Sequence, residues 1–136
     1  MPANTVSQYF LDVAELQQAF PDFIVGFDLV GQEDLGEPLI NFLKEILAGM
    51  EANPELEVFF HAGETNWLGM PTDLNVIDAL LLNTTRVGHG YAIAKHPEAK
   101  RIAKEKGISI EVGICFTNAL IRNSMLNKPM KFKNNL

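Results

Sequence analysis

A chain of 136 residues has room for one domain with a hydrophobic core, but it is short for a complete eight-stranded barrel enzyme. Its net charge of −6 argues against nucleic acid as the main partner, because binding a phosphate backbone needs clustered Lys and Arg side chains. We expect no membrane contact and no signal peptide, since no apolar stretch approaches the roughly 20 residues that cross a bilayer and residues 1–5 lack basic and apolar regions.

Apolar residues alternate between helical and strand spacing along most of the chain. Steps of three and four residues over residues 6–20 predict an amphipathic helix. Residues 23–29, FIVGFDL, are apolar on both faces and predict a strand that is covered on both sides. A second helix is expected from Pro38 to the segment 49–54, and residues 56–60 predict a second strand.

The second half repeats the pattern. We expect Asp73 to cap a third helix that runs to Leu81, and residues 85–88 to form a short third strand. A fourth helix is expected over 97–106 and a fourth strand over 108–112. Strand and helix alternating at intervals of roughly 25 to 30 residues predict right-handed βαβ units, so the fold class is α/β with a parallel sheet.

The composition changes after Val112. Residues 113–136 are rich in Asn and Lys and show no further clear strand-helix unit. We therefore expect one domain over residues 1–112 and a divergent C-terminal tail over residues 113–136. The single cysteine, Cys115, excludes an internal disulfide.

Polar side chains follow three of the predicted strands. Asp28 lies at the end of the first strand and residues 30–34 follow it, residues 61–64 (HAGE) follow the second strand, and His89 follows the third. Histidine is a common Zn²⁺ ligand, and a nearby glutamate can transfer protons. A lone histidine at a strand end is more often structural, and Gly31 could simply serve a turn. Parallel strands share one carboxyl edge, however, where ligands bind, so together these residues favour a metal-dependent site.

Three segments closely resemble the adenosine deaminase family. They are residues 26–34 (GFDLVGQED), residues 59–67 (FFHAGETNW) and residues 82–90 (LNTTRVGHG). The resemblance runs over most of the chain and is nearest to the secreted adenosine deaminase-like growth factor branch. It implies a (β/α)8 TIM barrel of the metal-dependent hydrolase type, of which this chain holds about four parallel strands with helices. The implied reaction is the hydrolytic deamination of adenosine to inosine and ammonia, with 2′-deoxyadenosine as the other expected substrate.

The resemblance implies roles for four residues. His61 matches a ligand of the single Zn²⁺ ion of the complete barrel. Glu64 matches the residue that protonates purine N1 and then takes a proton from the attacking water. His89 matches the histidine that orients this water, and Gly31 matches a glycine whose backbone contacts the purine.

Most of the family's zinc ligands are missing from this sequence. The chain has no His-x-His pair, its remaining histidine being His96, and it has no Asp-Asp pair. The family's next motif, Cys-Pro-x-Ser-Asn, is matched only loosely by residues 113–118 (GICFTN). One of four protein ligands is therefore present, and we expect the chain alone to be inactive.

Two other functions stay open. The chain could be a non-catalytic truncated paralogue or isoform that acts as a binding protein, or part of another amidohydrolase with a different ring substrate. The unpaired edge strands of a half-barrel also suggest a possible homodimer. The resemblance implies a secreted, extracellular protein, in which the sequon that begins at Asn83 would accept a glycan.

Overall fold

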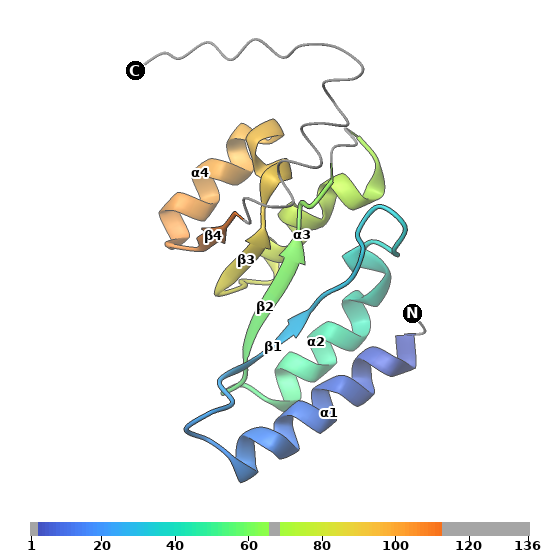
Figure 1. The fold of residues 1–136 in the computed structure, drawn as a ribbon, viewed down its shortest axis with the longest axis vertical. Coiled ribbons are helices and arrows are strands. Elements are labelled where there is room, and N and C mark those ends of the chain that lie inside the picture. Colours follow the sequence, from blue (N-terminus) through green and yellow to red (C-terminus); the bar gives the residue numbers. More distant parts are fainter. Residues whose placement is uncertain (1–2, 66–68, 113–136) are drawn as a thin grey trace.

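The computed structural model describes residues 3–65 and 69–112. Four parallel strands lie side by side in chain order, as Figure 1 shows. Their bounds are Gly26–Leu29 (β1), Glu57–Ala62 (β2), Arg86–His89 (β3) and Ser109–Glu111 (β4). The predicted parallel order and α/β class are confirmed. The boundary predicted after Val112 stays a prediction, because residues 113–136, with Cys115, lie outside the described part of the chain.

One helix precedes the first strand and the others connect the strands, as the periodicity predicts. The α-helices are Ala3–Ala19 (α1), Leu43–Ala52 (α2), Asn75–Leu81 (α3) and Pro97–Lys106 (α4). Three 3-10 helices precede α2, α3 and α4, namely Leu39–Phe42 (η1), Pro71–Leu74 (η2) and Tyr91–Lys95 (η3). The second and third α-helices therefore begin later than predicted. Within the described residues, no helix is long and apolar enough to cross a membrane.

The prediction that Asp73 caps the third helix is wrong. Asp73 lies inside η2 and is fully buried, where its carboxylate accepts a hydrogen bond from the Gly69 amide at 3.0 Å. It also pairs with Lys95 at 2.5 Å and with His96 at 3.2 Å. Burial raises the pKa of Asp73, but the bonds from Lys95 and Gly69 outweigh it and leave the pKa lowered. This carboxylate thus ties the segment after β2 to the segment after β3.

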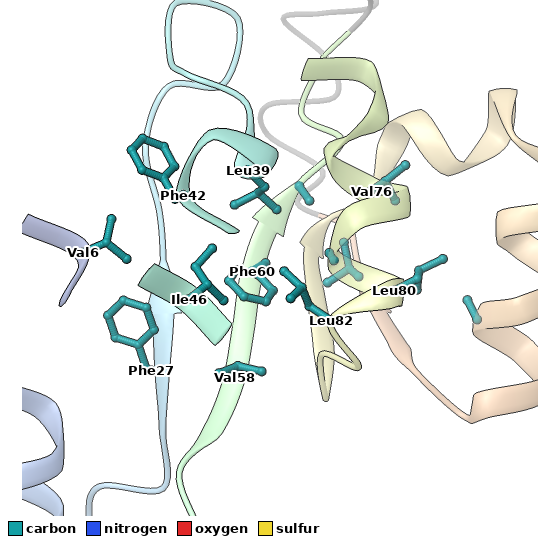
Figure 2. Close-up of a cluster of buried hydrophobic side chains, with 14 of the residues drawn as sticks. Val6, Phe27, Leu39, Phe42, Ile46, Val58, Phe60, Val76, Leu80 and Leu82 are labelled. Atoms are coloured by element: carbon teal, nitrogen blue, oxygen red, sulfur yellow. The ribbon is translucent and has the colours of Figure 1, made fainter. Parts of the chain in front are cut away.

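One face of the sheet forms the hydrophobic core. Strand residues that point to this face, such as Phe27, Val58 and Phe60, are buried against side chains from the helices, as Figure 2 shows. The ring of Phe27 lies 4.4 Å from the ring of Phe10 on α1, centroid to centroid. Burying each large apolar side chain contributes about 1.5–3 kcal/mol, so this face holds the strands in place and leaves the opposite face for polar side chains.

Candidate active site

All four predicted site residues lie at the carboxyl edge of the sheet. His61 is on β2, Glu64 follows β2, His89 is the last residue of β3, and Gly31 follows β1. The His61 and His89 ring centroids are 5.1 Å apart, and His89 Nε2 lies 3.8 Å from a carboxylate oxygen of Glu64. The structure therefore brings three of these side chains into one cluster.

Gly31 and His61 also line one pocket of about 190 Å³, which opens between the segment after β1 and the start of η1. A Cβ atom added at Gly31 would meet nothing within 4 Å, and the Gly31 backbone is not left-handed. Gly31 lies in a bend, but its backbone is not in the left-handed region that favours glycine, so the expectation that this bend needs a positive φ is wrong. Glu64 and His89 are not among the described residues that line this pocket.

The His61 ring is held by two neighbouring strands. Its Nδ1 lies 3.0 Å from a carboxylate oxygen of Asp28 on β1. On β3, a Cβ atom added at Gly88 would lie 3.0 Å from the His61 ring, so a larger residue would push the imidazole aside. With Nδ1 on the carboxylate, Nε2 is the nitrogen left for another ligand.

Arg86 connects all four strands across the polar face. Its guanidinium lies 3.1 Å from Asp28 on β1, pairs with Glu111 on β4, and sits 5.5 Å above the Phe59 ring of β2. The pair with Asp28 holds the carboxylate that orients His61. Our sequence analysis missed Arg86, although a charged residue inside a short apolar strand indicates a polar inner face.

His89 has an unusual backbone. Its φ is +63°, in the left-handed region, and Gly90 follows with φ of +58°. A non-glycine residue held there costs on the order of 1–3 kcal/mol, and such strain collects at functional sites. The amide of Gly90 donates to the Ala62 carbonyl at 3.0 Å, which ties this turn to β2 and brings His89 next to Glu64.

A buried carboxylate, Glu33, lies beneath the segment that carries Glu64. It accepts hydrogen bonds from the backbone amides of Gly63 and Glu64 and from the Asn75 side chain. Burial raises the pKa of Glu33, and these three bonds oppose the rise only in part. Our sequence analysis placed Glu33 among the polar residues after the first strand but assigned it no role, because its partners lie 30 to 42 residues away.

The residues present fit part of a zinc site. His61, with Nδ1 on Asp28 and a side chain that is 25% exposed, suits one ligand. In the described part of the chain, no group of three or more His, Cys, Asp or Glu side chains could hold a metal ion.

Known proteins resemble this chain over most of its length. The family model described as adenosine deaminase matches residues 5–128. An adenosine deaminase of Lutzomyia longipalpis is 57% identical over 100 residues, which cover 74% of this chain and 19% of that protein. An adenosine deaminase of Aedes albopictus is 48% identical over 106 residues, which cover 77% of this chain and 19% of that protein. Human adenosine deaminase 2 is 46% identical over 97 residues, covering 71% and 19%. The chain thus spans about a fifth of the length of the curated relatives it matches.

Proposed function

Because this chain belongs to the adenosine deaminase family, we propose that it supplies four strands of a barrel enzyme that hydrolyses adenosine or 2′-deoxyadenosine. The products are ammonia and inosine, or 2′-deoxyinosine when the substrate is 2′-deoxyadenosine. The observation that carries the proposal is the cluster at the carboxyl edge, where Glu64 and His89 lie 3.8 Å apart beside the oriented ring of His61. Proton transfer and metal binding both need groups placed in this way.

Glu64 would move the protons of the reaction. Hydrolytic deamination forms a bond between a water oxygen and purine C6 and breaks the bond between C6 and the amino nitrogen. A carboxyl that protonates N1 makes C6 more electrophilic, and the resulting carboxylate can then accept a proton from the attacking water. The amino group leaves as ammonia once it is protonated. The 22% exposed side chain of Glu64 suits a group that meets substrate in a closed site.

His61 would hold one Zn²⁺ ion through Nε2, with its other ligands coming from outside this chain. When bound, the ion lowers the pKa of a coordinated water towards 7. His89 would orient the water, since its Nε2 already faces Glu64. Gly31 would let the purine approach the backbone of the segment after β1, which explains a glycine that neither packing nor conformation requires.

The isolated chain should bind no stoichiometric zinc and deaminate no adenosine, because catalytic zinc sites normally use three protein ligands. A chimaera should do both if the 100 matched residues of this chain replace the corresponding segment of the Lutzomyia longipalpis adenosine deaminase. Mass spectrometry gives the zinc content, and the absorbance change from adenosine to inosine gives the rate. The unaltered relative is the control.

The outcomes separate the possible functions. Robust activity of the isolated chain would overturn the ligand count. A folded, zinc-loaded chimaera that does not deaminate adenosine would favour a binding protein, and one that deaminates another ring would favour a different amidohydrolase.

We also propose that the protein is secreted, in line with its resemblance to the growth factor branch. Asn83 is exposed and precedes β3 at the edge opposite the site. Expression of the complete protein in a secreting cell should therefore give a glycan at Asn83, seen as a mass increase on its peptide. Thr85→Ala, which removes the exposed third sequon residue, should abolish the glycan. An unmodified protein retained in the cell would contradict secretion.

A further inference from the structure

We propose that Glu33 is a positioning residue, whose carboxylate fixes the backbone of Glu64 and so sets where the proton-transferring carboxyl lies. This inference rests on the proposed function, since Glu64 needs a fixed position only if it transfers protons. Glu33 lines the same pocket as Gly31 and His61, but its carboxylate oxygens are occupied by the backbone amides of Gly63 and Glu64.

The two oxygens of Glu33 divide the contacts between them. Oε1 accepts from the amide of Gly63 at 2.9 Å and from the Asn75 side chain at 2.8 Å, and Oε2 accepts from the amide of Glu64. Two consecutive backbone amides on one carboxylate leave that peptide little freedom to rotate. Hydrogen bonds to an ionised acceptor are about twice as strong as neutral ones, so the Glu33 carboxylate strongly restrains this peptide.

The same peptide segment is held from the other side. Gly63 has φ of +82°, and its carbonyl accepts a hydrogen bond from the Ala92 amide at 2.9 Å. A Cβ atom at Gly63 would lie 3.2 Å from Ala92 and 3.3 Å from Gly90. Gly63 is thus clamped between Glu33 and the segment that follows His89. This arrangement fixes Glu64 relative to His89.

Glu33 is in turn held by a buried amide. The Asn75 side chain, 4% exposed, donates to Glu33 and accepts from the Leu39 amide at 2.9 Å. Glu33 is 9% exposed, so water has little room to replace a lost partner. Glutamine has the same size, but its NH₂ group would face an N–H donor where glutamate has an oxygen. At least one of the three donors to Glu33 would then lose its acceptor.

The test compares Glu33→Gln with Glu51→Gln, the same chemical change at an exposed position on α2. In the chimaera with the Lutzomyia longipalpis enzyme, we expect Glu33→Gln to lower kcat per bound zinc on the order of 10²-fold, as misplacing a catalytic group does. KM and zinc stoichiometry should change little, because glutamine keeps the size of the side chain that lines the pocket and the contact of His61 with Asp28 remains. Glu51→Gln should leave all three unchanged.

A second readout does not depend on catalysis. In the full 136-residue chain, NMR hydrogen exchange should show the amides of Gly63 and Glu64 protected, and Glu33→Gln should speed their exchange on the order of 10-fold. If the unsubstituted chimaera is inactive but the amides respond in this way, the proposed function fails. The hold of the Glu33 carboxylate on the Gly63 and Glu64 amides is then still supported. Unprotected Gly63 and Glu64 amides in the unsubstituted chain would show that Glu33 does not hold this backbone. In an active chimaera, a Glu33→Gln variant with unchanged kcat per zinc would overturn the positioning role.

Discussion

Replacing Glu64 with glutamine in the chimaera should remove nearly all turnover and leave zinc bound. Glutamine has the size of glutamate but cannot release or accept a proton near neutral pH, so N1 protonation is lost. General acid–base groups contribute about 10²–10⁴-fold, and we expect a loss at the upper end because Glu64 would serve both proton transfers. The inosine absorbance assay measures the loss, and zinc mass spectrometry checks the metal.

The matched control for this experiment is Glu57→Gln. Glu57 lies at the amino end of the same strand, is exposed and is far from the carboxyl edge. We expect it to change neither zinc content nor rate. A loss of zinc in Glu64→Gln would indicate that Glu64 is a metal ligand. A rate within a few fold of that of the unsubstituted chimaera would show that another group transfers the protons.

Hydrophobic periodicity was sufficient to predict the α/β class and the parallel order of the four described strands. The alternating burial of Val58, Phe60 and Ala62 reflects one face packed on helices, a constraint that each strand carries in its own sequence. The strand order agrees with the rule that short connections leave consecutive parallel strands as neighbours. Both features depend on residues close together in the chain.

The polar contacts could not be predicted in the same way, because their partners are distant in sequence. Asp28 and Arg86 are 58 residues apart, and Glu33 and Asn75 are 42 apart. Asp73 shows the resulting error. Its position before an apolar run is typical of a helix cap, but burial beside Lys95 and His96 gave it stronger partners than its own helix offers.

The polar face explains why the strands carry charge inside a barrel. Asp28 and Glu111 flank the Arg86 guanidinium, so the two negative charges lie next to a positive one. The Arg86 and Asp28 side chains are both partly buried, at 30% and 28% exposed, so each charge is stabilised by having the other beside it. The surroundings of His61 on β2 thus depend on charges from β1, β3 and β4.

The three histidines of this chain allow a single comparison of metal binding with catalysis. In the chimaera, His61→Ala should lose stoichiometric zinc and with it all measurable turnover. Changes to residues that only orient a ligand typically cost 10–100-fold in metal affinity, and loss of the ligand itself should cost more than about 100-fold. His89→Ala should keep the metal but lose most of the rate, since it would remove the group that faces Glu64.

His96→Ala is the control for both variants. His96 contacts Asp73 rather than the cluster, and Lys95 remains to pair with that carboxylate, so zinc content and rate should stay close to those of the unsubstituted chimaera. Chelator competition gives the zinc affinity of each variant, and the absorbance assay gives the rate. If His61→Ala retained zinc while His89→Ala released it, the two roles would have to be exchanged. If both retained zinc and full activity, neither histidine would belong to the site, because the carboxyl-edge cluster would then contribute nothing that the reaction needs.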